Sequence, residues 1–199
     1  LLLVRHAEPE RVEAGRGVPA NPSLTERGRV QADRLAEWLA GEKIDAVVSS
    51  PQQRAIETAA PIAAAHSLQI DVVEGIVEFD VQADDYIPIE ELKATNDPRW
   101  RAMVDGTWHD FGGEDPTVFR TRVLAAVDQL ISTYAGQRVV AVCHGGVVNV
   151  ALGAVLGIDR PLWFDPAYTS LSRIAASRNG VRSLVSLNET AHLEARRGT

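Results

Sequence analysis

Several features that mark other classes of protein are scarce in this sequence. It contains one cysteine, Cys143, so an intramolecular disulfide is excluded; this favours a reducing compartment, and we expect a cytoplasmic protein. No apolar run approaches the length that spans a membrane. Basic residues are outnumbered, 20 against 27 acidic ones, and the net charge of −7 argues against nucleic acid or an anionic membrane as a partner.

The signatures of bound cofactors are also missing. The sequence has no glycine-rich nucleotide loop of the Walker type, and its five histidines are dispersed without the carboxylate spacing of a metal site. We therefore expect no cofactor and no metal.

What is present is a pattern of alternating apolar strands and helices in 199 residues, a length that suits one domain over residues 1–199. Strands are predicted at 1–4, 46–49, 70–73, 138–142, 171–176 and 181–187, and helices at 25–40, 51–66, 115–136 and 144–156. In the first helix, Val30, Leu35, Trp38 and Leu39 are expected on one buried face. Asn179-Gly180 predicts a hairpin between the last two strands. The fold class is thus α/β, a three-layer α/β/α sandwich with a mostly parallel sheet and an antiparallel edge hairpin.

In the segment from about 80 to 113 the apolar residues follow neither the period of a helix nor that of a strand, and we expect a long irregular insertion there. Such a segment commonly forms a lid or binding loop, so we expect it to select the substrate. Its aromatic residues Tyr86, Trp100 and Trp108 are the candidates for that role.

Polar residues follow directly after three of the predicted strands. Arg5 and His6 end the first strand, the stretch 49–54 with Arg54 follows the second, and His144-Gly145 follows the strand at 138–142. In a parallel sheet these junctions open at one edge, so the residues can meet around one ligand. Arginine with histidine at such a place suggests an anion site, with phosphate as the first candidate.

Four blocks of this sequence resemble those of the histidine phosphatase superfamily, which includes the cofactor-dependent phosphoglycerate mutases. They are Arg5-His6-Ala7-Glu8, with Ala7 where the family usually has glycine, then Leu24-Thr25-Glu26-Arg27-Gly28, Ser49 to Ala59, and Val142 to Val147. The blocks occur in the family's order and span most of the chain.

Each candidate residue then has an expected role. His6 is the proposed nucleophile, because a neutral imidazole nitrogen can attack phosphorus and form a phosphohistidine. Arg5, Arg54 and Gly145 are expected to bind the phosphate, and His144 to donate a hydrogen bond to the transferring group. Glu8 is expected either to orient one of these groups or to be an ordinary loop carboxylate.

The resemblance implies an acid after the third strand that protonates the leaving oxygen, and Glu78 stands where it is expected. The glycine and Trp-Glu-Gly that usually follow are absent, so Asp80, Asp84 and Asp85 are rivals for this role.

The sequence therefore favours a metal-independent phosphomonoesterase that acts on a small phosphorylated metabolite through a phosphohistidine. A phosphoglycerate mutase ranks second, because the insertion offers only Arg99 and Arg101 for a second acidic group. A catalytically idle phosphate-binding regulatory module is the third alternative. The sequence determines neither the substrate nor the oligomeric state.

Overall fold

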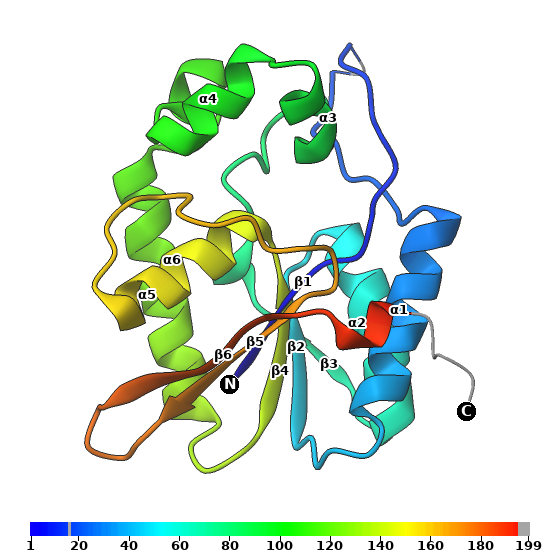
Figure 1. Ribbon diagram of the computed structural model, residues 1–199, viewed down its shortest axis with the longest axis vertical. Coiled ribbons are helices and arrows are strands. Elements are labelled where there is room, and N and C mark those ends of the chain that lie inside the picture. The colour runs from blue at the N-terminus through cyan, green and yellow to red at the C-terminus, as the bar shows by residue number, and fades with distance from the viewer. Residues whose placement is uncertain (16, 195–199) are drawn as a thin grey trace.

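The computed structural model describes residues 1–15 and 17–194 and has one six-stranded sheet with helices on both faces (Figure 1). The strands are β1 (Leu2–Arg5), β2 (Ala46–Ser49), β3 (Ile70–Val72), β4 (Val139–Cys143), β5 (Leu171–Ala176) and β6 (Arg182–Glu189). The helices are α1 (Glu26–Leu39), α2 (Gln53–His66), α3 (Ile89–Ala94), α4 (Pro98–Asp105), α5 (Pro116–Thr133) and α6 (Gly145–Leu156), with 3₁₀ turns η1 (Glu74–Ile76), η2 (Trp108–Phe111) and η3 (Ala191–Leu193).

The sheet is mostly parallel, as the sequence predicts. Its strand order is β3-β2-β4-β1-β5-β6. The first four strands of that order run parallel, whereas β5 pairs antiparallel with β1 and then with β6. The predicted edge hairpin is therefore confirmed, with Gly180 at a φ of 87° in its turn.

Two hydrophobic cores cover the two faces of the sheet. Residues of α1 and α2 such as Leu35 and Ile62 pack on one face, and residues of α5 and α6 such as Phe119 and Leu152 pack on the other. In Figure 1 these pairs of helices lie to the right and left of the sheet. This is the expected three-layer sandwich.

The first helix differs from its prediction in which residues it buries. Leu35 and Leu39 are buried as expected, but Val30 and Trp38 are 46% and 49% exposed. The buried stripe of α1 instead includes Gly28, Gln31 and Ala32. Tight contact with the loop after β1 favours this stripe, because a Cβ at residue 28 would lie 2.1 Å from the Glu8 carbonyl oxygen.

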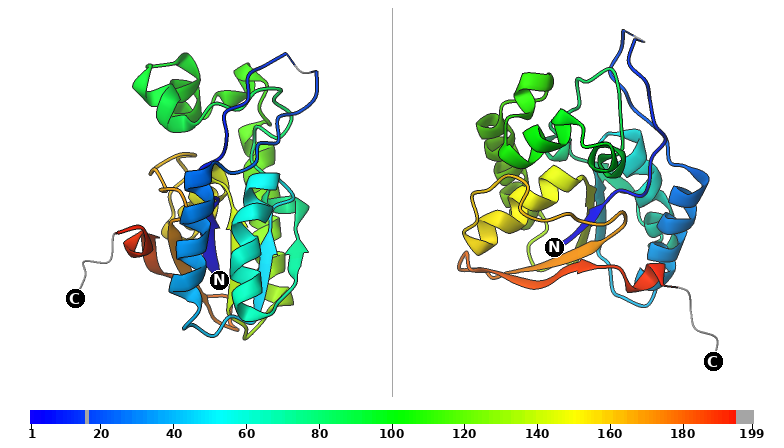
Figure 2. Two further views of the ribbon diagram at one scale, coloured as in Figure 1. Left: turned by 90° about the vertical axis from the view of Figure 1, so that its right-hand side faces the viewer. Right: turned by 45° about the horizontal axis from the view of Figure 1, so that its top comes forward.

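The expectation of an irregular insertion at 80–113 is wrong, since this segment contains α3, α4 and η2. The helices are short, of 6 and 8 residues, too few turns to show a clear apolar period. Asp97 accepts a hydrogen bond from the Arg99 amide as the N-cap of α4. The two helices stand over the carboxyl ends of the parallel strands (Figures 1 and 2).

Candidate active site

The register of the sheet brings the two histidines together. Arg5 at the end of β1 lies level with Cys143 at the end of β4, so His6 and His144 occupy equivalent positions one residue further on. The His6 amide donates to the Cys143 carbonyl at 2.8 Å, and the two imidazole rings lie 5.1 Å apart between centroids. The convergence expected at this sheet edge is therefore present.

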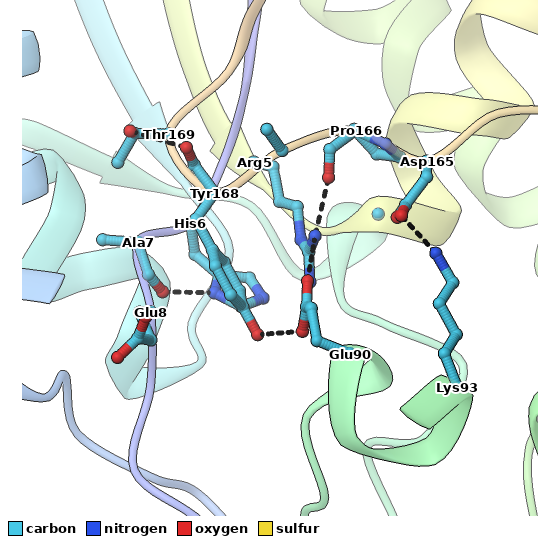
Figure 3. A network of polar contacts seen from close by, with 12 residues as sticks. Arg5, His6, Ala7, Glu8, Glu90, Lys93, Asp165, Pro166, Tyr168 and Thr169 are labelled. Atoms are coloured by element: carbon cyan, nitrogen blue, oxygen red, sulfur yellow. Dashed lines mark hydrogen bonds and ion pairs between the residues drawn. The ribbon is translucent and has the colours of Figure 1, made fainter. Parts of the chain in front are cut away.

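His6 is held in one tautomer. Its Nδ1 lies 2.8 Å from the carbonyl oxygen of Ala7 (Figure 3), and since a carbonyl only accepts, Nδ1 carries the proton. The lone pair is then on Nε2. Burial, with Arg54 and Arg5 nearby, lowers the pKa of His6 well below its usual value, so the ring is neutral near pH 7.

Arg5 is anchored from two sides. Its Nη1 donates to the carbonyl of Pro166 at 2.6 Å and to Oε1 of Glu90 at 3.2 Å, and its guanidinium lies 4.0 Å from the centroid of the Tyr168 ring (Figure 3). Its Nε is buried and has no hydrogen-bond partner among the described residues.

Arg54 enters the same space from the first turn of α2. Its side chain is 1% exposed, and Nη2 lies 3.6 Å from Oδ1 of Asp80. Within residues 1–15 and 17–194, neither Nε nor Nη1 of Arg54 has a hydrogen-bond partner. The N-terminal end of α2 adds a favourable field for an anion at this point.

His144 is fully buried, and its Nε2 lies 2.8 Å from Oγ of Ser50. Burial, followed by Arg54 and His6, lowers the pKa of His144 well below its usual value. Nδ1 of this neutral ring meets no hydrogen-bonding atom of the described chain. In the tautomer whose Nε2 accepts from the Ser50 hydroxyl, Nδ1 carries the ring proton and can donate it to a ligand.

Glu78 follows η1 and faces the start of α6. Its Oε2 accepts from the Gly146 amide at 2.8 Å, and its Oε1 accepts from the Phe79 amide at 3.2 Å. Burial and the nearby Asp80 raise the pKa of Glu78 to about 7. A carboxyl group with that pKa can give and take a proton near neutrality.

The rivals of Glu78 are not equally placed. Asp84 accepts from the Gly15 amide at 3.1 Å, and Asp85 pairs with Arg99 at 2.8 Å, so both face away from His6. Asp80 lines the same cavity as Glu78 and stays a rival.

A cavity of about 330 Å³ joins these groups to solvent, and Arg5, His6, Arg54, Glu78 and Gly145 all line it. Tyr86 and Trp100 also line it, whereas Trp108 lies in the core. Trp108 stacks on Phe79 at 4.5 Å and donates from Nε1 to the Glu114 carbonyl, which corrects its expected place in the pocket wall. Glu8 bonds to Thr25 and Arg27 instead of a site residue.

The described part of the chain contains no group of three or more His, Cys, Asp or Glu side chains that could hold a metal ion. In the same part, no helix is long and apolar enough to cross a membrane.

The sequence profile of the histidine phosphatase superfamily (branch 1) matches residues 1–190. This chain belongs to that superfamily. It is 32% identical to phosphoserine phosphatase 1 of Hydrogenobacter thermophilus over 97% of this chain and 93% of that protein. It is 35% identical to a bifunctional protein of Mycobacterium tuberculosis over 97% of this chain but 54% of the relative, about half its length.

The solved structures agree with this assignment at the level of the fold. A mycobacterial glucosyl-3-phosphoglycerate phosphatase superposes with a TM-score of 0.78 at 22% identity, covering 96% of this chain and 99% of that one. Two of these relatives are named as phosphatases of small phosphorylated molecules, and the superfamily assignment makes this chain a phosphatase-type α/β protein.

The sequence of this superfamily member did not point to three residues that lie around Arg5 and His144. Ser50 orients His144, Tyr168 covers Arg5 with its ring 5.8 Å from that of His6, and Glu90 joins Arg5 to the Tyr168 hydroxyl. Ser50 lies within the block from Ser49 to Ala59 that resembles the superfamily. Glu90 and Tyr168 reach the site only through the folding of α3 and of the segment after α6, and no local sequence signal marks them.

Proposed function

We propose that this protein is a metal-independent phosphomonoesterase that hydrolyses a small-molecule phosphate ester through a phosphohistidine at His6. The observation that carries the proposal is the set of buried donors without partners around His6, namely Arg5 Nε, Arg54 Nε and Nη1, and His144 Nδ1 in the described chain. An unpaired buried donor costs about 1–3 kcal/mol, so a group with several acceptor oxygens is the expected ligand. The phosphoryl group has three such oxygens.

In the first step, Nε2 of His6 attacks phosphorus while the bond from phosphorus to the ester oxygen breaks. The Ala7 carbonyl holds the Nδ1 proton and so supports the positive charge that develops on the ring. The carboxyl group of Glu78 gives its proton to the departing oxygen, which leaves as an alcohol.

In the second step, water attacks the phosphohistidine. The Glu78 carboxylate takes a proton from that water, the bond from phosphorus to Nε2 breaks, and inorganic phosphate and neutral His6 result. The arginines and His144 donate to the oxygens of the transferring group in both steps. Because these donors supply the positive field, the chemistry does not require a divalent ion.

The mutase alternative has less support from the geometry. It calls for cations in the cavity beyond the phosphate-binding arginines. The two arginines named from the sequence do not supply them, since Arg99 pairs with Asp85 and Asp97, and Arg101 is exposed. Lys93 and Arg160 do line the cavity, but Lys93 is in an ion pair with Asp165 and Arg160 is exposed. A small phosphorylated metabolite is the substrate that fits the cavity.

The test is capture of the phosphoenzyme. After rapid acid-free quenching with a radiolabelled aryl phosphate, we expect a label that is stable in alkali and lost in acid, and we expect His6→Ala to give neither label nor turnover. Appreciable turnover by His6→Ala contradicts the proposal. Turnover of phosphoglycerate primed with 2,3-bisphosphoglycerate at or above the phosphatase rate would assign the same phosphohistidine to a mutase.

A further inference from the structure

The walls of the cavity beyond the phosphate-binding residues are largely apolar. They come from two segments that meet over the strand ends, 86–104 and 158–166. The side chains that carry the argument are Ile87, Ile89, Trp100, Met103, Leu162 and Phe164. A leaving group bound to the phosphoryl group at His6 must contact this surface.

Asn149 of α6, one of the polar residues that line the cavity, is already committed to the protein. Asn149 donates from Nδ2 to the carbonyls of Gly145 and Phe164, and its Oδ1 accepts from the amides of Trp163 and Phe164. The indole Nε1 of Trp163 donates to the Asn149 carbonyl at 3.0 Å. A hydroxyl or amino group of a substrate would have to displace one of these bonds to gain Asn149 as a partner.

Two cations, Lys93 and Arg160, lie at the rim, and Lys93 is in an ion pair. Lys93 binds Asp165 through an ion pair between α3 and the segment after α6 (Figure 3), and its Nζ lies 4.4 Å from the centroid of the Trp100 ring. Arg160 is exposed and solvated. The two acids of the lining, Asp80 and Asp165, lie beside Arg54 and Lys93 respectively.

We propose that the cavity selects phosphomonoesters of apolar alcohols, alkyl or aryl, over the phosphates of sugars, amino acids and hydroxy acids. This inference rests on the proposed phosphatase function and names its substrate class. The volume of about 330 Å³ is at the lower end of small-molecule sites, which suits one ring or a short chain. Burial of apolar surface supplies the binding energy, and a polar leaving group loses its hydration without replacement.

The experiment is a series of n-alkyl phosphates from ethyl to octyl, whose leaving groups have nearly the same reactivity. Burial of one methylene predicts a rise of about fourfold in kcat/KM for each carbon until the cavity is filled. Glycerol phosphate, phosphoserine and 3-phosphoglycerate should fall below the alkyl ester of matched length. A flat or falling series, or a preference for any of the three polar esters, overturns the inference.

Binding of the corresponding n-alkylphosphonates, measured by calorimetry, separates this inference from the phosphatase proposal. If no ester is hydrolysed but phosphonate affinity still rises with chain length, the phosphatase function fails and the apolar selection stands. If affinity is independent of chain length, the selection fails whatever the turnover.

Two variants test the two walls independently. Met103→Gln and Leu162→Gln should each reduce the hexyl-to-ethyl ratio of kcat/KM by about tenfold, since each places a polar group against the chain. Leu156→Gln is the matched control, because Leu156 is 44% exposed on α6 away from the cavity. Melting temperatures show that the variants are folded, and an unchanged ratio in both wall variants contradicts the assignment of these walls.

Discussion

Replacing Gly146 with alanine should displace the carboxyl group of Glu78, the proposed proton donor, without disturbing Arg5, His6 or Arg54. The Gly146 amide binds Oε2 of Glu78 at 2.8 Å, and a Cβ added there would lie 2.4 Å from Oε1 of the same carboxyl group. The neighbouring Phe79 ring, 3.1 Å from that Cβ, stacks on Trp108 and cannot move aside easily. The Glu78 carboxyl group is therefore the part that moves.

The size of the effect follows from the distance. Ordinary contact begins at 3.4 Å, so the oxygen must shift by about 1 Å. A displacement of about 1 Å in a reacting group costs about 100-fold in rate. We expect that loss in kcat/KM for an alkyl phosphate, whose leaving oxygen needs a proton, and a much smaller loss for p-nitrophenyl phosphate, whose leaving group departs without one.

The assay compares the two esters in the wild type, Gly146→Ala and Gly41→Ala. Gly41 is the control because a Cβ there meets nothing within 4 Å. The fold should tolerate the change, since alanine at a helical position is favoured over glycine by about 1 kcal/mol. Equal losses on both esters, or none on either, would refute the assignment of Glu78 as proton donor and turn attention to Asp80.

Three further predictions concern charge. Since burial raises the pKa of Glu78 to about 7, kcat/KM for an alkyl phosphate should fall as the pH rises through about 7. Glu78→Gln should lack this fall at high pH. If both proteins show the same fall, another group is responsible for it. Glu90→Gln should tighten inhibition by vanadate up to about fivefold, because it removes a partly exposed carboxylate beside Arg5. Glu91→Gln is the control, since Glu91 lies beside Arg11 instead. Weaker inhibition of Glu90→Gln would mean that Glu90 holds Arg5 in place. Activity should persist in EDTA, and loss that a divalent ion restores would overturn the metal-independent mechanism.

The sequence was most informative where the chain is buried in the sheet. Arg5, His6 and His144 follow uninterrupted apolar strands, and parallel pairing places the ends of such strands at one edge, so their convergence could be predicted. The acid was harder to identify, because several carboxylates follow β3 and only the fold directs Glu78 toward α6 while Asp85 turns to Arg99.

The walls of the cavity were the least predictable part. Trp108 was expected to line it because aromatic residues in an insertion commonly contact ligands, but packing against Phe79 and Phe119 places it in the core. Glu90 and Tyr168 are 78 residues apart in the chain and meet only in the folded protein. Short capped helices such as α3 and α4 carry too few turns to show an apolar period.

The division between strand-end chemistry and helical walls has a consequence for how such a protein changes over generations. The phosphate-binding residues are embedded in the cores that hold the sheet together, so most substitutions beneath them would cost stability. The wall at 86–104 contacts the sheet edge through Glu90 on Arg5 and the other wall through Lys93 on Asp165, and many wall residues are only partly buried. Substitutions in the walls should therefore cost the protein little stability. Substitutions in α3 and α4 can therefore change which leaving group the protein accepts, while the residues at the strand ends stay the same.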